Sequence, residues 1–361
     1  FTRLQTFVGK ISALMNPLTF VIVNSAILVL VWTGAWRVEG GILTQGAVVA
    51  LVNYMSQILV ELIKMANLII LISKAAACMR RNRIQKVLEV EPSMENGSKE
   101  CIEEKRTPAN AVDFNHVSLT YSGAGAPSLT DIDLHVKTGQ TIGIIGGTGS
   151  GKTSVVNLIP RFYDATQGNV LVFGKPVKEQ DMESLRSQIA VVPQKAVLFA
   201  GTIRENMKWG KEDATDEEIM EALTIAQAAE VVQKKEGGLD AFVEQGGKNL
   251  SGGQRQRLTI ARALVRKPRI LILDDSASAL DFATDAALRK AIREMKNAPT
   301  VFIVSQRTSS IRFADQILVL DDGKSVGVGT HDELLTTCSV YKEIYDSQYK
   351  KTDSKKSGKE A

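Results

Sequence analysis

The sequence predicts a chain of two parts, an all-α membrane hairpin followed by a large α/β domain. The first 90 residues are strongly apolar, whereas the remainder mixes charged residues, glycines and short apolar runs. From Val112 onward, β-rich runs lead into a glycine-rich loop and then into a helix-compatible stretch. A chain of 361 residues has room for one soluble domain of about 200 to 250 residues and something smaller. Two regions in two different solvents are therefore implied.

Two apolar stretches predict the hairpin. The first has no charged side chain over the 26 residues from Ile11 to Trp36. The second, Ala47 to Ala77, is interrupted only by Glu61, Lys64 and, near its end, Lys74. Each is long enough to cross a hydrocarbon core of roughly 30 Å. We expect spans at about 17–37 and 46–77, within a membrane part that covers residues 1–88.

Basic residues flank the outer ends of the hairpin, while the loop between the spans holds only Arg37 against Glu39. Positively charged residues gather on the cytoplasmic side of membrane proteins. We therefore expect both ends, and the α/β domain, in the cytoplasm beneath the plasma or inner membrane. The basic residues are Arg3, Lys10, Lys74, Arg80, Arg81, Arg83 and Lys86.

The second span has a polar face along its length. With an advance of about 100° per residue, six polar side chains fall within an arc of about 140°. Charges at membrane depth are costly and usually face a bundle interior or a watery path. This polar stripe is a candidate lining for a translocation route, with a polar seam between packed helices as the alternative. The residues are Asn53, Ser56, Gln57, Glu61, Lys64 and Asn67.

The rest of the chain divides by composition. Residues 89–110 are charged, lack sustained periodicity and are interpreted as a linker. Residues 111–348 form the α/β domain, and the lysine-rich end, 349–361, is expected to be a disordered basic tail rather than a contact for anionic lipids. Because the chain starts at Phe1 without a leader, we expect it to be part of a longer protein.

Charge and cysteine content exclude several classes of function. The formal charge of +4 is small and the basic residues are scattered, so no nucleic-acid partner is expected. The three cysteines are unpatterned and fit neither a disulfide framework nor a zinc site.

A phosphate-binding loop is predicted at residues 146–153. It matches the P-loop pattern and lies between an apolar strand and a helix-compatible stretch. Backbone N–H groups of such a loop close around phosphate oxygens, and the helix N-terminus adds its positive end. Lys152 would reach the β- and γ-phosphates of a nucleotide, and Thr153 would hold Mg²⁺. The candidate binding residues are Gly146, Gly147, Thr148, Gly149, Ser150, Gly151, Lys152, Thr153 and Ser154.

A second element of this site is the apolar run 270–273, which ends in Asp274. A carboxylate in this place is expected to hold a metal ion beside a P-loop. Alone the pattern is weak, but together with the P-loop it predicts ATP and Mg²⁺ as cofactors.

Between these elements, Leu250-Ser251-Gly252-Gly253-Gln254 opens a helix. Here the chain resembles the ABC transporter ATPase family, whose signature is LSGGQ. The resemblance implies an α/β P-loop ABC ATPase domain with an antiparallel β subdomain and a helical subdomain. It also implies that the two spans, with Gly34, Gly46 and Tyr54, are the last two of six membrane helices of an exporter half-transporter.

The resemblance assigns further roles. Tyr121 stands where the family stacks an aromatic ring on adenine, and Gln194 where a glutamine links Mg²⁺ to the membrane domain. Residues 278–281 match the segment that crosses to a partner domain. In the family, two ATP molecules lie between two such domains, each bound by the P-loop of one and the LSGGQ of the other.

Two residues depart from the family pattern. Asp275 stands where a glutamate polarises the attacking water, and Gln306 where the switch histidine is expected. Aspartate withdraws the carboxylate by roughly 1.5 Å, and a misplacement of about 1 Å can cost around 10²-fold in rate. Glutamine cannot become cationic beside a developing γ-phosphate charge. We therefore expect a site that binds ATP but hydrolyses it poorly.

The expected function is the ATP-binding and permease subunit of an exporter for a drug, a peptide or a lipid, lying in the lipid bilayer. The intact LSGGQ favours a heterodimer in which this chain completes the competent site of a second, different half-transporter, as in similar heterodimeric bacterial multidrug exporters. A homodimer with a working Asp275 and a regulatory ATP-binding subunit are alternatives. So is a soluble ABC ATPase for translation or DNA maintenance, although the long uncharged run argues against it.

Overall fold

The computed structural model describes residues 2–80, 88, 90, 92, 94–99, 101 and 109–356; side chains are not described for 2–13, 15, 16, 77–80, 277 and 350–356. The chain forms two compact units, Phe1–Pro92 and Ser93–Ala361.

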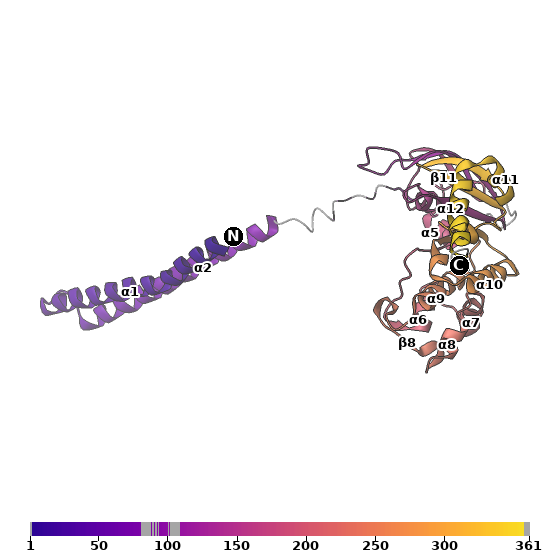
Figure 1. The fold of residues 1–361 in the computed structure, drawn as a ribbon. Helices are drawn as coiled ribbons and strands as arrows, with labels where there is room; N and C mark the ends of the chain where they lie inside the picture. Colours follow the sequence, from indigo (N-terminus) through magenta and orange to yellow (C-terminus); the bar gives the residue numbers. More distant parts are fainter. Residues whose placement is uncertain are drawn as a thin grey trace. The chain divides into compact units, whose positions relative to one another are not determined.

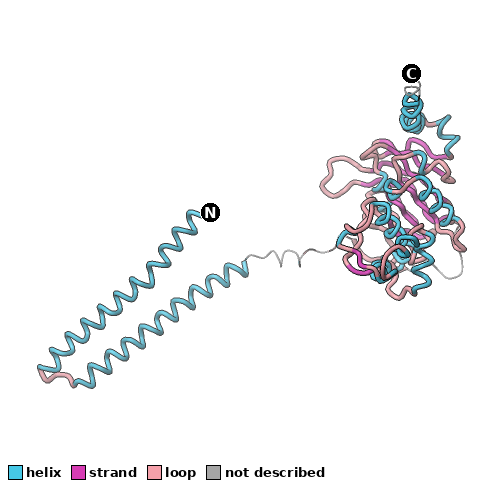
Figure 2. The backbone as a smooth tube through the Cα atoms, turned by 60° about the horizontal axis from the view of Figure 1, so that its bottom comes forward, coloured by secondary structure: helices cyan, strands magenta, loops and turns pink. Residues whose placement is uncertain are grey.

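The first unit is a pair of antiparallel helices, α1 (Thr2–Glu39) and α2 (Gln45–Arg80), joined by a short loop (Figure 2). They approach closely at Gly34, where a Cβ atom would lie 2.7 Å from Val48 Cγ1. The segments Pro17–Glu39 and Gln45–Ala76 are long and apolar enough to cross a membrane. The expected membrane hairpin is therefore present as a helical pair.

The polar stripe lies on α2. Glu61 and Lys64 form an ion pair at 2.7 Å, and both side chains are largely exposed in this chain. Ser56 donates its hydroxyl hydrogen to the Val52 carbonyl, so it is satisfied within its own helix. Of the flanking basic residues, Arg81, Arg83 and Lys86 lie outside the described residues, as do the side chains of Arg3, Lys10 and Arg80.

The second unit is built on a ten-stranded sheet of order β5-β4-β1-β2-β12-β11-β3-β10-β9-β6. At one end of this sheet, β1 pairs with β2 and β4 in antiparallel fashion. Toward the other end, the neighbouring strands in the order β11-β3-β10-β9-β6 pair in parallel. The antiparallel strands at the first end are β1 (Asn110–Leu119), β2 (Leu129–Lys137), β4 (Gln167–Val172) and β5 (Lys175–Pro176). The remaining strands are β3 (Thr141–Gly146), β6 (Ile189–Val192), β9 (Ile270–Asp274), β10 (Thr300–Val304), β11 (Gln316–Asp321) and β12 (Lys324–Gly329).

The core lies on both faces of the sheet. Successive side chains of a strand point to opposite faces, and in β11 Ile317 and Val319 join one apolar cluster while Leu318 and Leu320 join the other. The central strands β3 and β10 are buried at every position, as expected of parallel strands covered on both sides.

Helices cover the sheet and also form a separate group. Figure 1 shows α6 to α9 gathered at one end of the second unit, with α11 and α12 at the other. Threonine or serine caps α6, α7, α9 and α11 with capping boxes. The helices are α4 (Lys152–Leu158), α5 (Met182–Ser187), α6 (Ile203–Lys208), α7 (Asp216–Ile225), α8 (Ala229–Gln233), α9 (Gly252–Leu264), α10 (Phe282–Arg293), α11 (His331–Thr337) and α12 (Ser339–Lys356), with a small β7 (Gly201–Thr202) and β8 (Phe242–Val243) pair.

Two segments differ from the organisation expected from composition. The helix α12 continues through residues 349–356, where a disordered tail was expected. Its first turns are anchored by the fully buried Tyr341, and lysine is a good helix former, so the helix extends beyond its packed part. Within the expected linker, Lys99 forms a bridge to Gln180, and the backbone N–H of Cys101 donates to Ser184. This part of the linker therefore packs on the second unit.

Candidate functional site

The P-loop connects β3 to α4 and depends on glycine for its shape. Gly151 caps α4 with φ 93°, and a Cβ atom there would lie 2.6 Å from Leu129 Cδ2. A Cβ atom at Gly146 would overlap the Leu320 carbonyl. By contrast, Cβ atoms at Gly147 and Gly149 would meet no other atom within 4 Å. The loop is thus packed tightly underneath and open above, as a phosphate cradle requires.

Lys152 lies within this cradle with 9% of its surface exposed. Its ammonium group donates to the carbonyls of Gly146 at 2.9 Å and Gly147 at 2.6 Å. Burial lowers the pKa of Lys152, while the nearby Asp275 and Asp274 act in the opposite direction. A bound phosphate would supply the anionic partner that this desolvated cation lacks.

Thr153 and Asp274 meet beside the cradle. The Thr153 hydroxyl donates to Asp274, 3.1 Å from Oδ2 and 3.3 Å from Oδ1. Two adjacent ligands of an octahedral Mg²⁺ lie about 3 Å apart, so the spacing of these oxygens is compatible with a Mg²⁺ ion. Burial raises the pKa of Asp274, against the hydrogen bond from Thr153. A divalent cation would relieve this penalty.

Asp275 follows directly and contacts Gln194. The Gln194 amide donates to Asp275 Oδ2 at 3.1 Å, because β6 and β9 are neighbouring parallel strands whose carboxyl ends meet at one edge of the sheet. Asp275 has φ 46°, a left-handed conformation that aspartate tolerates better than most residues. Its backbone N–H donates to the Val304 carbonyl at 2.9 Å.

Gln306 follows the neighbouring strand β10, in which Val304 pairs with Asp274. Its side chain is exposed, and its carbonyl accepts a hydrogen bond at 2.7 Å from the amide of Gln348. The strand ends thus bring the P-loop, Asp274, Asp275, Gln194 and Gln306 to one edge of the sheet.

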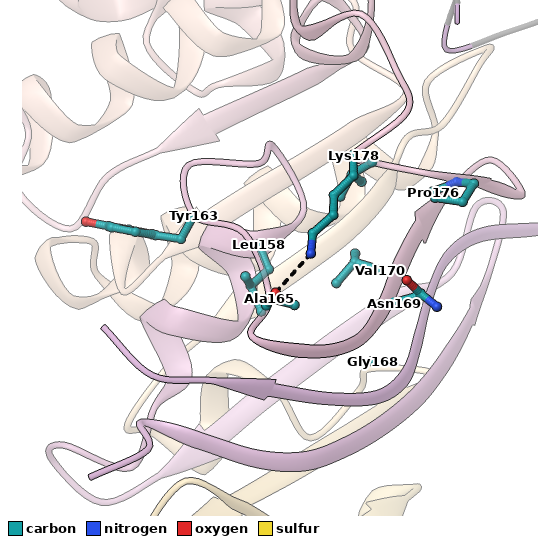
Figure 3. A pocket seen from close by; sticks show the side chains of 9 residues that line it. Leu158, Tyr163, Ala165, Gly168, Asn169, Val170, Pro176 and Lys178 are labelled. Carbon is teal, nitrogen blue, oxygen red and sulfur yellow. Dashed lines mark hydrogen bonds between the residues drawn. The ribbon is translucent and has the colours of Figure 1, made fainter. Parts of the chain in front are cut away.

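Tyr121 contacts the same region from the end of β1. Its hydroxyl lies 2.8 Å from Ser154 Oγ, and its ring meets Tyr163 edge to face at 4.8 Å between centroids. Figure 3 shows the other side of the Tyr163 segment, where Lys178 donates to the Ala165 carbonyl. The cavity there measures about 10 Å³, which holds at most one water molecule. This cavity is therefore too small for a nucleotide base.

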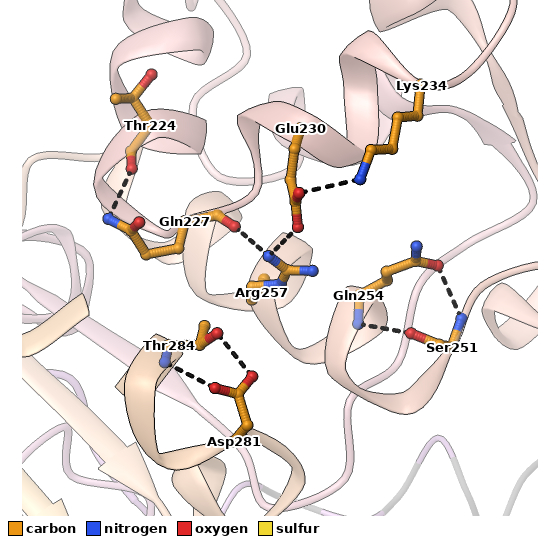
Figure 4. Close-up of polar contacts among 9 residues, drawn as sticks. All are labelled: Thr224, Gln227, Glu230, Lys234, Ser251, Gln254, Arg257, Asp281 and Thr284. Carbon is orange, nitrogen blue, oxygen red and sulfur yellow. Dashed lines mark hydrogen bonds and ion pairs between the residues drawn. The ribbon is translucent and has the colours of Figure 1, made fainter. Parts of the chain in front are cut away.

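The signature segment forms the N-terminus of α9. Ser251 Oγ accepts from the Gln254 N–H at 3.2 Å while Gln254 Oε1 accepts from the Ser251 N–H at 2.9 Å (Figure 4). Ser251 and Gly252 are exposed, and a Cβ atom at Gly253 would lie 3.3 Å from the Ala279 carbonyl. The amino end of a 13-residue helix is thus presented to solvent, which suits an anionic ligand.

The segment 278–281 is tied to both neighbours. Ser278 Oγ donates to the Asp275 carbonyl at 2.8 Å, and Asp281 caps α10 by accepting from the Thr284 N–H and hydroxyl (Figure 4). Within the described part of the chain, no hydrogen bond joins Ser251 or Gln254 to the P-loop. The predicted residues therefore form two separate groups, one at the P-loop and one at the start of α9.

Sequence reasoning overlooked Tyr163 and Gln348. Tyr163 follows α4 in an irregular stretch, and Gln348 lies 42 residues after Gln306. No sequence motif surrounds either residue. Their importance follows only from their contacts in the folded domain, with Tyr121 and Gln306 respectively.

Comparison with known proteins gives consistent matches. A family model described as ABC transporter matches residues 129–278. The chain is 42% identical over 334 residues to the uncharacterized ABC transporter ATP-binding protein YfiB of Bacillus subtilis, covering 92% of this chain and 57% of that protein. It is 37% identical over 341 residues to the probable multidrug resistance ABC transporter ATP-binding/permease protein YheI of the same organism, covering 94% and 57%.

A solved structure agrees with these matches. A bacterial Atm1-family ABC exporter with ATP bound aligns with a TM-score of 0.75 and 29% identity, over 93% of this chain and 59% of that one. The chain thus spans somewhat more than half the length of the relatives that it matches.

Proposed function

We propose that the chain is a member of the ABC transporter family, with the exporter arrangement of membrane helices followed by an ATP-binding domain, and that it is one subunit of an ATP-driven membrane exporter. The two apolar helices and the exporter relatives make it a membrane protein with a cytoplasmic ATP-binding domain. The observation that carries the proposal is the Thr153–Asp274 contact at 3.1 Å beside the glycine cradle, a ready site for Mg²⁺ and phosphate.

ATP and Mg²⁺ are the proposed cofactors. The P-loop amides and Lys152 would bind the phosphates, Thr153 and Asp274 would hold Mg²⁺, and Tyr121 would stack on the base. Bound ATP supplies the phosphoanhydride bond whose hydrolysis drives the cycle. The chain's own residues would bind and orient it, because Lys152, Thr153 and Asp274 are all present beside the two altered positions.

Hydrolysis at this site is proposed to be slow. The carboxylate of Asp275 is one methylene shorter than glutamate and already accepts from Gln194 at 3.1 Å. The exposed Gln306 offers a neutral amide in place of an imidazolium. Both alterations weaken stabilisation of the transition state, while Lys152, Thr153 and Asp274 keep their binding roles.

The exposed start of α9 supports a second proposal, that Ser251 and its neighbours Gly252, Gly253 and Gln254 contact ATP held by a partner subunit. Their separation from the chain's own P-loop group suits this division. The partner is proposed to be a different half-transporter with its own glutamate and histidine. The substrate is proposed to be a small molecule, peptide or lipid, since YheI is named as a probable multidrug resistance transporter and the polar stripe of α2 lies in a membrane helix.

The test is ATP hydrolysis and photoaffinity labelling of the full-length protein in lipid, alone and with its partner. We expect labelling of this chain by an azido-ATP in both cases, and transporter-level hydrolysis only with the partner. Hydrolysis by this chain alone at a rate typical of exporters would leave the homodimer as the explanation. Labelling that persists in a Lys152→Ala variant would contradict the assignment of the P-loop.

A further inference from the structure

The side chain of Gln348, on α12, grips the backbone of the switch loop, which we define as Ser305–Ser310. Gln348 Oε1 accepts from both the N–H and the hydroxyl of Thr308, each at 2.9 Å, and Gln348 Nε2 donates to the Gln306 carbonyl at 2.7 Å. The side-chain amide of Gln348 thus pairs with the backbone N–H of Thr308 and the backbone carbonyl of Gln306, as the backbone of a neighbouring strand would. These contacts link a C-terminal helix directly to the loop that carries Gln306.

Both partners in this grip are fixed. Thr308 is fully buried. Gln348 lies about two turns beyond Tyr341, which is also fully buried and whose hydroxyl lies 2.7 Å from His331 Nδ1. The helix is therefore anchored on the domain before it reaches the switch loop.

The opposite end of the switch loop is held by α10. Arg289 donates to the Ser310 carbonyl at 3.3 Å, and this guanidinium is paired with Asp285 at 2.6 Å and lies 3.7 Å from the centre of the Phe313 ring. With its backbone secured at both ends, the loop presents the exposed side chain of Gln306 from a rigid support.

We propose that Gln348 is a positioning residue, which holds the switch loop so that Gln306 meets the terminal phosphate of ATP bound at this site. The inference rests on the proposed ATP site, and it assigns to α12 the control of how long that site retains its nucleotide. Loss of the grip breaks the hydrogen bonds to the Thr308 N–H and to the Gln306 carbonyl. The switch loop can then move between several conformations. Initial binding through Lys152 and Thr153 should be little affected, because the hydrogen bonds described for these two side chains go to the P-loop and to Asp274.

The first measurement is hydrogen exchange of peptides that cover the switch loop in the full-length transporter. In a Gln348→Ala variant, exchange of the Thr308 amide should rise by about tenfold without nucleotide. A Gln348→Glu variant keeps the acceptor for Thr308 but loses the donor to Gln306, and should give a smaller rise. The matched control is Glu343→Ala, an exposed position on the same helix, which should change nothing.

The second measurement is the dwell time of azido-ATP on this chain, followed by chase and photolabelling. Gln348→Ala should shorten it by about 3- to 10-fold, while the concentration for half-maximal labelling stays within about twofold. Unchanged Thr308 exchange, or an equal loss of affinity and dwell time, would overturn the proposal. If the chain bound no ATP, the proposed function would fail while the exchange measurement still tested the grip.

Discussion

The amide of Gln194 donates a hydrogen bond to Asp275 Oδ2 at 3.1 Å. The two residues follow neighbouring parallel strands, β6 and β9. The contact occupies one oxygen of the carboxylate that stands where a catalytic base is expected. The glutamine proposed to bind Mg²⁺, Gln194, is therefore hydrogen-bonded to the aspartate, whose side chain is one methylene shorter than that of glutamate.

The first prediction concerns the charge of Asp275. An Asp275→Asn variant removes the carboxylate but keeps a residue type that tolerates φ 46°. We expect the assembled transporter to keep more than about half of its ATP hydrolysis, whereas amide substitution of the partner's catalytic carboxylate should lower it by about 10²-fold or more. Steady-state phosphate release measures both. An equally large loss from Asp275→Asn would mean that this site hydrolyses ATP.

The second prediction restores the family residues. An Asp275→Glu, Gln306→His double variant should raise hydrolysis at this site by about tenfold or more, because it returns the longer carboxylate and a group that can carry charge. The measurement requires a partner with a disabled catalytic carboxylate, so that only this site is counted. No increase would show that geometry elsewhere, such as the partner's signature, limits the rate.

The elements that carry the site could be predicted from the sequence because their signals are local. The apolar strand expected before the P-loop is β3, Thr141–Gly146, and the apolar run ending in Asp274 is β9. Glycines, apolar runs and a following helix lie within a few residues of one another there.

The contacts between these elements could not be predicted in the same way. Gln194 and Asp275 are 81 residues apart, and Gln348 and Thr308 are 40 apart. They meet because of the strand order β3-β10-β9-β6 and the return of α12 to the switch loop, which no local pattern contains. The lysine-rich end differs from its expectation for a related reason. Its composition favours disorder, whereas the structure continues the anchored helix α12 to Lys356.

The third prediction tests the P-loop lysine. Lys152→Ala should reduce ATP binding by at least about 10²-fold, because it removes the cation that faces the phosphates. Folding should be little affected, since the substitution also removes a desolvated ammonium group whose pKa is lowered by burial. Nucleotide labelling and thermal unfolding measure the two effects. Lys137→Ala, at an exposed position of β2, is the control and should alter neither.

The fourth prediction separates two roles of Ser251. Ser251→Ala removes the cap of α9 and should cost about 1 kcal/mol of stability. Ser251→Asp retains a capping oxygen but brings a negative charge toward the partner's ATP, so stability should persist while transporter hydrolysis falls by about tenfold or more. Thr215→Ala breaks a comparable capping box on α7 and should lower stability alone. Full activity in Ser251→Asp would remove Ser251 from the partner's site.

The last prediction concerns the part of the expected linker that packs on the second unit. Cys101 is 1% exposed, and burial raises the pKa of its thiol to about 11. At pH 8 only about a thousandth of such a thiol is thiolate, so Cys101 should resist iodoacetamide in the folded protein. The thiol ionises more readily in the unfolded chain, so its contribution to stability should fade as the pH rises above about 9.

Gly97 offers the means to disturb this packing selectively. A Cβ atom there would overlap the backbone of Glu179 and Gln180. Beside it, the Lys99 N–H donates to the Glu179 carbonyl, and the Lys99 carbonyl accepts from the Asp181 N–H. A Gly97→Ala variant must therefore displace the segment, and labelling of the Cys101 peptide at pH 8 should accelerate by about tenfold. Ser98→Ala, at the exposed neighbouring position, should leave the rate unchanged. Equal labelling of the two variants would mean that residues 94–99 and 101 do not stay docked in solution, because a docked segment cannot accept a side chain at Gly97 without moving.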